Sequence, residues 1–204
     1  AMPWIKEVPA VLQAWFLGSE AGNAIAAVLM GDVNPSGKLP FTFPARLEDV
    51  PAHQLGEYPG SEKVGDIVNE KYNESIFVGY RWADKQKKAK PLFPFGHGLS
   101  YTTFEYGKPV ADKKTMTADD TITFTVTVKN TGDREGQEVV QLYISDETGA
   151  PIAGGRVPQV LRGFSKVWLA PGEERDVEFV LTARDLAHYD PTRHAWYAAP
   201  GRYL

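Results

Sequence analysis

Two apolar patterns of different period follow each other near the start of the chain. Val11–Leu17 is a nearly continuous apolar run, which is typical of a strand buried on both faces in a parallel sheet. In Ser19–Met30, apolar residues recur at i, i+4, i+7 and i+8 from Ala21, which favours a helix with one apolar face. Ser19 suits its N-cap and Gly31 its C-terminal end. These patterns predict one strand and one helix, a βα unit.

A single βα unit cannot cover its own apolar surface, because a strand that is apolar on both sides needs neighbouring strands and helices. The next forty residues, Asp32 to about Lys71, contain five prolines and offer no second unit of that kind. We therefore expect the rest of this sheet to belong to polypeptide outside the 204 residues.

From about Ala118 the period changes to two. Ile122, Phe124, Val126 and Val128 alternate with threonines, as in a strand with one buried face. Further strands are expected at Glu138–Ser145, Leu161–Leu169, Val177–Leu181, His194–Tyr197 and Gly201–Leu204, the last continuing past the end of the chain, with turns at Asn130–Asp133 and Pro171–Glu174. Short alternating strands separated by turns predict an antiparallel β-sandwich.

Composition narrows the classes of partner. A net charge of −4 does not indicate binding to nucleic acid or to an acidic membrane surface. No apolar stretch reaches the length of a membrane span. The basic run Lys85–Lys90 is interpreted as a solvated loop. The chain has no cysteine, which excludes disulfides but leaves the compartment open, with a periplasmic or secreted location favoured over a cytoplasmic one.

No residue pattern marks a catalytic or metal site. The histidines have no metal-ligand spacing, and we expect neither a metal nor a cofactor; they are His53, His97, His188 and His194. Ser36 and Ser100 lie in turns without a His–acid arrangement. His97, between two glycines, is interpreted as a structural residue hydrogen-bonded in a tight loop.

The carboxylates likewise single out no acid pair of the kind that a retaining glycosidase needs, because most fall in turns or at strand edges, such as Asp119, Asp120, Glu173 and Glu174. Tyr72–Trp82 concentrates aromatic residues around Glu74 and Arg81, which suits sugar contact. Because Ile76, Val78 and Tyr80 alternate as in a strand, packing is favoured over sugar contact.

Five motifs, in order, resemble glycoside hydrolase family 3. They are GSEAGNAIAAVLMGDVNPSGKLPFTFP (Gly18–Pro44), YNESIFVGYRWAD (Tyr72–Asp84), LFPFGHGLSYTTFEY (Leu92–Tyr106), VKNTGDREGQEVVQLYISD (Val128–Asp146) and VLRGFSKVWLAPGE (Val160–Glu173). The sequences of these motifs are similar to those of the bacterial β-glucosidases of the family that carry a fibronectin type III-like domain.

The resemblance implies a mainly β chain in three parts. Residues 1–44 would be the C-terminal piece of an α/β/α sandwich, 45–106 a loop-rich linker packing on both domains, and 107–204 a fibronectin type III-like β-sandwich. The family's Asp nucleophile and Glu acid/base would lie on upstream polypeptide, so no catalytic residue is assigned here and Glu20 is interpreted as structural. Substrate-binding residues stay unassigned. Two proline-rich peptides, Asn34–Pro44 and Pro94–Phe104, would clamp the domains together.

Three functions stay open at this point. The first is the non-catalytic C-terminal part of a retaining β-glucosidase, with the upstream catalytic portion as its partner and a β-glucoside or oligosaccharide as substrate. The second is the same part of a β-xylosidase or another β-glycosidase. The third is a stand-alone carbohydrate- or protein-binding module, for which Trp82, Trp168 and Trp196 are candidates, although in a sandwich we expect them in the core or an interface. The open face of the βα unit also suggests a homo-oligomer.

Overall fold

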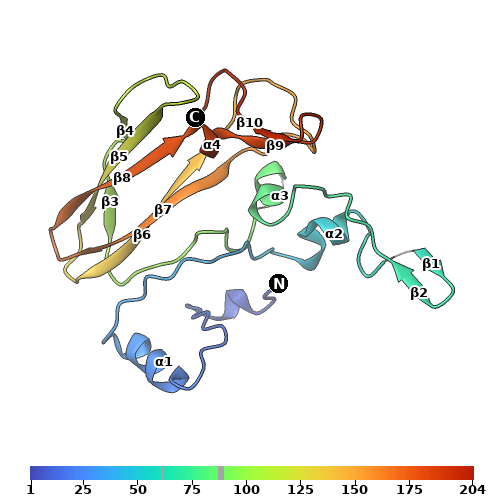
Figure 1. Ribbon diagram of the computed structural model, residues 1–204. Coiled ribbons are helices and arrows are strands. Elements are labelled where there is room, and N and C mark those ends of the chain that lie inside the picture. The colour runs from blue at the N-terminus through green and yellow to red at the C-terminus, as the bar shows by residue number, and fades with distance from the viewer. Residues whose placement is uncertain (61, 87–89) are drawn as a thin grey trace.

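The computed structural model describes residues 1–60, 62–86 and 90–204; the side chains of residues 62–64 are also outside the description. Figure 1 shows a β-sandwich, a long connecting region from which a small hairpin protrudes, and an N-terminal segment that carries one helix. Of the loop predicted at Lys85–Lys90, residues 87–89 lie outside the described residues, and Lys85 is the last residue of a helix.

The sandwich consists of two antiparallel sheets. In the first sheet, β5 (Thr121–Asn130) pairs with β8 (Glu174–Thr182) on one edge and with β3 (Phe104–Tyr106) and β4 (Val110–Ala111) on the other. In the second, β6 (Gly136–Ile144) pairs with β7 (Val160–Leu169), with a register shift between Leu142 and Tyr143. The predicted antiparallel β-sandwich is confirmed; β3 and β4 were not predicted.

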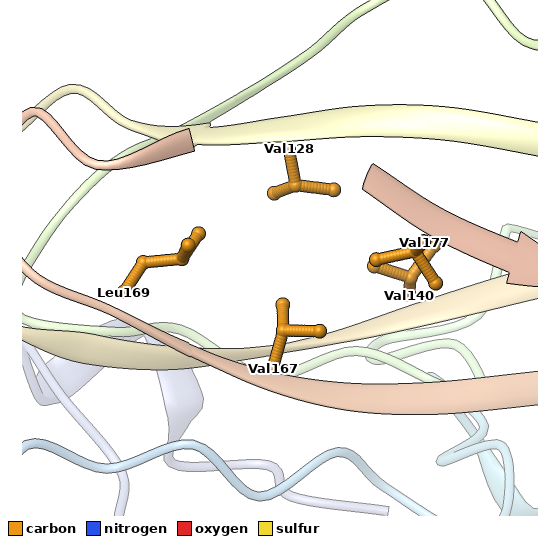
Figure 2. Packing of buried hydrophobic residues seen from close by; sticks show 5 residues of the cluster. All are labelled: Val128, Val140, Val167, Leu169 and Val177. Atoms are coloured by element: carbon orange, nitrogen blue, oxygen red, sulfur yellow. The ribbon is translucent and has the colours of Figure 1, made fainter. Parts of the chain in front are cut away.

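The main core lies between these two sheets. Val128 from one sheet and Leu169 from the other are fully buried, and Val140, Val167 and Val177 pack with them, as Figure 2 shows. A second cluster joins Ile122, Ile144 and Leu181. Burying one such side chain stabilises a fold by about 1.5–3 kcal/mol. The apolar residues that alternate along the sequence therefore pack against one another, and the sandwich forms this core from its own strands.

One end of the sandwich departs from the prediction. A short helix α4 (Ala183–Leu186) leads to the hairpin of β9 (His188–Asp190) and β10 (Ala195–Tyr197). The strand predicted at Gly201–Leu204 is wrong: these residues form a single bridge, Asp146↔Tyr203. Strand β6 ends at Ile144, and the C-terminal residues pair with the residues that follow it. Ser145 and Leu204 exchange two backbone hydrogen bonds, of 2.6 and 2.9 Å.

In the N-terminal segment, the helix is confirmed and the strand is wrong. After a 3₁₀ turn η1 (Ile5–Glu7), helix α1 runs from Ala21 to Met30; its N-cap is Glu20 rather than Ser19. It ends at Gly31, whose φ of 81° is the left-handed conformation expected there. Val11–Leu17 forms no strand, because no described segment pairs with it and Trp15 has a φ of 54°. No helix in the described part of the chain is long and apolar enough to span a membrane.

The connecting region is less irregular than predicted. It holds the 3₁₀ turn η2 (Leu47–Asp49), α2 (Pro51–Gln54), the hairpin of β1 (Glu62–Val64) and β2 (Ile67–Asn69), and α3 (Tyr80–Lys85). The strand expected at Ile76–Tyr80 is wrong. Gly79, with a φ of 57°, breaks an extended path, and the helix α3 that follows sets Tyr80 against Phe95 and Tyr143, with ring centroids 4.8 and 6.0 Å apart.

Candidate interdomain interface

The two proline-rich peptides lie side by side and pair through their backbones. Leu39 N–H donates to His97 O at 2.8 Å, and Gly96 N–H donates to Leu39 O at 2.7 Å. Further along, Phe43 and Phe93 form an isolated antiparallel bridge. Prolines restrict both peptides to extended paths, so two segments about sixty residues apart form one rigid connector. We call Asn34–Pro44 and Pro94–Phe104 together the clamp.

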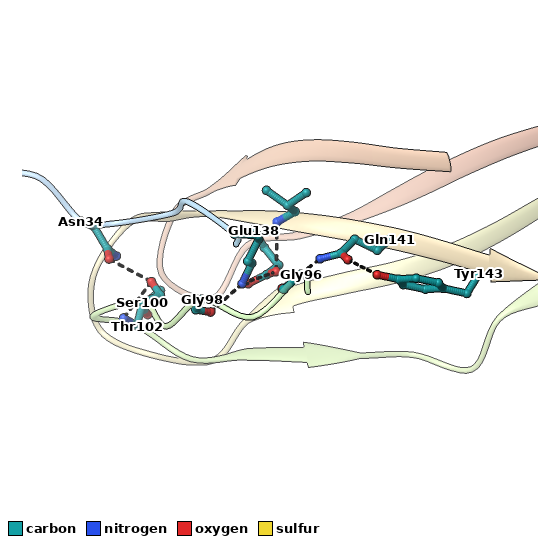
Figure 3. Close-up of polar contacts among 10 residues, drawn as sticks. Asn34, Gly96, Gly98, Ser100, Thr102, Glu138, Gln141 and Tyr143 are labelled. Atoms are coloured by element: carbon teal, nitrogen blue, oxygen red, sulfur yellow. Dashed lines mark hydrogen bonds and ion pairs between the residues drawn. The ribbon is translucent and has the colours of Figure 1, made fainter. Parts of the chain in front are cut away.

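Polar side chains attach the clamp to strand β6 (Figure 3). Lys38 forms an ion pair with Glu138 at 3.0 Å and donates to Gly98 O at 2.8 Å. Its side chain is 16% exposed and that of Glu138 10%, so the pair is largely shielded from water. Gln141 donates to Gly96 O at 3.1 Å and accepts from the Tyr143 hydroxyl at 2.7 Å. The clamp is thus bound to the sandwich by a charge and by directed hydrogen bonds.

Asn34 fixes the outer end of the clamp. Its amide donates to Glu135 O at 2.9 Å, while its carbonyl oxygen accepts from the Ser100 hydroxyl at 2.9 Å and the Tyr101 N–H at 2.8 Å. The Tyr101 hydroxyl in turn donates to Val28 O in α1 at 3.0 Å. One asparagine therefore ties together the turn before β6 and the second clamp peptide, and that peptide reaches α1.

The glycines of the clamp are required by close approach. A Cβ built on Gly98 would lie 2.0 Å from Gly37 O, and one on Gly96 would lie 2.3 Å from the Gln141 side-chain oxygen. His97 between them stacks on Phe93, with centroids 5.5 Å apart. Its ring makes no hydrogen bond to any described residue, in contrast to the loop hydrogen bond expected from the sequence. The motif therefore supplies close backbone contacts and one stacked ring.

A turn of β5 stabilises the sandwich next to the clamp. Asn130 is fully buried, and its amide donates to Arg134 O at 2.7 Å and Leu169 O at 3.0 Å. Its carbonyl oxygen accepts from the Thr102 hydroxyl at 2.7 Å and from Gly132 N–H at 3.1 Å. Since Thr102 belongs to the second clamp peptide, Asn130 connects the clamp, the turn and β7.

The other face of the connector is apolar and open. Nine large apolar residues of the N-terminal segment are exposed: Trp4, Val8, Val11, Leu12, Trp15, Phe16, Leu17, Leu29 and Met30. Trp15 packs edge-on against Phe41, which stacks on Phe43 of the clamp. Helix α1 has no buried residue. So many exposed large apolar side chains in one segment are typical of a protein–protein or domain interface.

The remaining candidate residues form no common site. Within the described ranges, no three of the His, Asp and Glu residues gather as metal ligands would. His53 lies on α2, His188 on β9 and His194 in the turn before β10. Ser36 lies within the clamp. Asp120 pairs with Lys113, whose hydrogen bond holds the pKa of that carboxyl below its ordinary value. Glu173 accepts from the Ala170 N–H and pairs with Arg175, and these hydrogen bonds, in that order, lower its pKa. The Glu174 carboxylate lies 3.9 Å from the Lys129 ammonium, and the Asp119 carboxylate makes no ion pair or hydrogen bond with any described residue.

The aromatic segment Tyr72–Trp82 divides between packing and exposure. Phe77 and Trp82 are buried, as packing requires, whereas Tyr72 is 77% exposed. Glu74 is also buried, and neither its Oε2 nor the Trp82 indole N–H has a hydrogen-bond partner among the described residues. Trp168 and Trp196 are exposed by 44% and 52%, so neither lies in the core of the sandwich, and an interface with other polypeptide stays the expectation for both.

Sequence reasoning missed Glu138, Gln141 and Asn130 as interface residues. A signal existed for Glu138, because it shares the buried register of Val140 and Ile144 along β6. A charge at such a position demands a partner. No comparable signal identified Lys38 as that partner, since one hundred residues separate the two.

Two models of known protein families match the chain. Residues 1–101 match the model of the glycosyl hydrolase family 3 C-terminal domain, and residues 138–204 match that of the fibronectin type III-like domain. A β-glucosidase of Bacteroides ovatus is 50% identical over 204 residues, which cover 99% of this chain and 26% of the relative. The thermostable β-glucosidase B of Acetivibrio thermocellus is 45% identical over 203 residues, 100% of this chain and 25% of its own.

Solved structures agree. DesR, a β-glucosidase from Streptomyces venezuelae crystallised with D-glucose, superimposes with a TM-score of 0.85 at 40% identity, over 99% of this chain and 25% of that one. A β-glucosidase of Bifidobacterium adolescentis gives 0.86 at 36% identity, over 98% and 28%. The chain spans about a quarter of the length of these relatives. The resemblance drawn from the motifs is confirmed: the chain belongs to glycosyl hydrolase family 3, as a C-terminal part of such an enzyme.

Proposed function

We propose that the protein containing this chain is a retaining β-glucosidase that hydrolyses terminal β-D-glucosyl residues, and that these 204 residues contribute no catalytic group. The observation that carries the proposal is the exposed apolar surface of residues 4–30, joined to a clamp that holds it on the sandwich. That surface fits an upstream catalytic portion, and the relatives matched along the whole chain are β-glucosidases by name. Hydrolysis with retention of the anomeric configuration requires two carboxyl groups about 5 Å apart. We assign no such pair to these 204 residues.

We further propose the division of labour along the chain. Residues 1–44 complete an α/β/α layer of the upstream portion, residues 45–106 pack on both domains, and residues 107–204 form the sandwich. The clamp supports this division because its contacts run from α1 through Asn34 and Lys38 to β6. Arg134 adds a hydrogen bond of 2.6 Å to Gly31 O, directly between the turn before β6 and the end of α1.

Activity assays on matched proteins test the catalytic part of the proposal. The full-length protein is expected to hydrolyse 4-nitrophenyl β-D-glucoside faster than the β-D-xyloside and to release β-glucose first, as seen by proton NMR. The 204-residue chain is expected to give no turnover above a blank. Turnover by the chain alone would contradict the proposal, and a preference for the xyloside would replace the glucosidase with the β-xylosidase alternative.

Association separates the enzyme part from a stand-alone module. The chain and the upstream polypeptide, produced separately, are expected to form a one-to-one complex by light scattering and to regain hydrolysis when mixed. In the absence of the upstream partner, the open surface is expected to produce homo-oligomers. A soluble monomer that does not bind the upstream polypeptide but binds insoluble glucan would support the stand-alone carbohydrate-binding module instead.

A further inference from the structure

One cavity in the described part of the chain lies at an end of the sandwich, apart from the clamp. Its volume is ≈ 300 Å³, in the lower range of small-molecule sites. The end of the sandwich forms most of its wall, from the start of β7, the loop around residues 152–157, α4 and the β9–β10 hairpin. Ile76 and Arg81 close it from the connecting region. None of the clamp residues lines it, so it is a separate feature.

The cavity holds an excess of arginine that the protein does not pair. Arg81 is half-buried, and its guanidinium makes no hydrogen bond or ion pair with any described residue. Arg162 uses one of its five donors, at 3.3 Å to Ala187 O. Burial lowers the pKa of Arg162, and the nearby charges of Arg81 and Arg184 lower it further, against the attraction of Asp185. Arg81 thus has no acceptor among the described residues, and Arg162, whose charge interacts with that of Arg81, makes a single hydrogen bond.

The acids in the cavity wall are already engaged. Asp146 pairs with Arg156, which also donates to two backbone carbonyls. Asp185 accepts two hydrogen bonds from Thr182, at 2.8 Å from its N–H and 2.7 Å from its hydroxyl. Burial raises the pKa of Asp185, but these hydrogen bonds and the charge of Arg162 outweigh it, and the pKa lies below its ordinary value. Both carboxylates are therefore engaged within the protein, whereas the Arg81 guanidinium and the remaining donors of Arg162 have no hydrogen-bond partner among the described residues.

An aromatic wall completes the cavity. Tyr189 and Trp196, from β9 and β10, meet edge-to-face with centroids 5.9 Å apart, and both are about half exposed. The Arg184 guanidinium stacks over the Trp196 ring at 3.6 Å, which stiffens the indole. A rigid aromatic surface beside unpaired guanidinium groups suits a ligand that has an apolar ring face and a carboxylate.

We propose that this cavity binds a uronic acid residue of an acidic oligosaccharide, with its carboxylate on Arg81 and Arg162 and its ring against Trp196. A neutral sugar would leave Arg81 unpaired and Arg162 with its single hydrogen bond, while planar guanidinium groups match a carboxylate in two parallel hydrogen bonds. The site holds the ligand without cleaving it, and its existence does not depend on the glycosidase activity proposed above.

Binding of a small charged sugar tests the proposal directly. Full-length protein, with D-glucose in excess to occupy any hydrolytic site, is titrated with methyl β-D-glucuronide and with neutral methyl β-D-glucoside by calorimetry. The glucuronide is expected to bind at least about tenfold more tightly, as one charge-assisted contact provides. Equal affinity for the two sugars, or no binding of the glucuronide, would overturn the proposal.

Matched variants locate the binding. Arg81→Gln and Trp196→Ala are each expected to weaken glucuronide binding by about tenfold or more, and Arg81→Lys to restore part of the loss. Arg175→Gln, on the exposed end of β8, is the control and should leave the affinity unchanged. Circular dichroism confirms that each variant is folded. Unchanged affinity in Arg81→Gln, or equally tight binding of a hexaglutamate peptide, would show that the cavity is not a uronic acid site.

Discussion

The β-sandwich and the N-terminal segment show opposite relations between apolar sequence and burial. In the sandwich, apolar residues of period two are buried against one another, down to fully buried Val128 and Leu169. In residues 1–31, an even denser apolar sequence buries no large side chain, and Phe16 is entirely exposed. An apolar pattern therefore indicates which side chains of a segment need to be buried. It does not indicate whether the segment that buries them belongs to the same polypeptide.

The clamp connects these two regions with polar contacts rather than with core. Lys38, Asn34 and the clamp glycines make bonds that depend on direction and distance, which fixes how the N-terminal segment leaves the sandwich. Apolar packing alone would not fix such a direction, because it is non-directional. The clamp thus holds the N-terminal segment, with its exposed apolar residues, in a fixed position on the sandwich, which has its own core.

Removing the buried amide of Asn130 is expected to have the largest effect. Asn130→Ala leaves the carbonyls of Arg134 and Leu169 and the Thr102 hydroxyl without their partner, and should lower the free energy of unfolding by about 4 kcal/mol. Urea denaturation of the 204-residue chain, followed by far-UV circular dichroism, measures it. Asn69→Ala, on the exposed hairpin, is the control and should cost less than about 0.5 kcal/mol. A loss of similar size in both variants would mean that the sandwich does not depend on this turn.

The ion pair of the clamp ranks next. Lys38→Met leaves the buried Glu138 carboxylate without its cation, and should lower the free energy of unfolding by about 3 kcal/mol. The double variant Lys38→Met/Glu138→Leu should cost less than the single one, because it removes the stranded charge as well. The same denaturation experiment measures both. A double variant less stable than the single one would show that the Glu138 carboxylate stabilises the fold even without Lys38, and would contradict the expected cost of a stranded charge.

Sequence patterns predicted the sandwich far better than the connections around it. The threonine-alternating strand β5 and its partner β8 are long and periodic, and both were predicted. β3 and β4 were missed because they are three and two residues long and take their register from β5. Val11–Leu17 was assigned as a strand because a continuous apolar run does not reveal whether its neighbours are present. The pairing of Lys38 with Glu138 is set by tertiary geometry, which local periodicity does not contain.

A methyl group at Gly98 should separate the two clamp peptides. The Cβ of Gly98→Ala would lie 2.0 Å from Gly37 O, so the backbones must move apart, at a cost of about 2 kcal/mol in the free energy of unfolding. Gly37→Ala is the matched control on the facing peptide, because its Cβ would meet open space. Hydrogen exchange at the Leu39 and Gly96 amides should accelerate in Gly98→Ala alone. Equal protection in both variants would show that the close approach of the peptides does not stabilise the clamp.

The smallest effect on stability is expected where the apolar surface is most open. Phe16→Ser changes the most exposed large apolar side chain, so the free energy of unfolding of the chain should move by less than about 0.5 kcal/mol. Its complex with the upstream polypeptide should nevertheless weaken by about tenfold or more, because a buried aromatic anchor would be lost there. Phe164→Ser, on the 71% exposed Phe164 of β7, is the control: it should also leave stability nearly unchanged but keep the association intact. If instead Phe16→Ser destabilises the isolated chain, the N-terminal segment buries Phe16 within the chain, and the contrast between the two regions disappears.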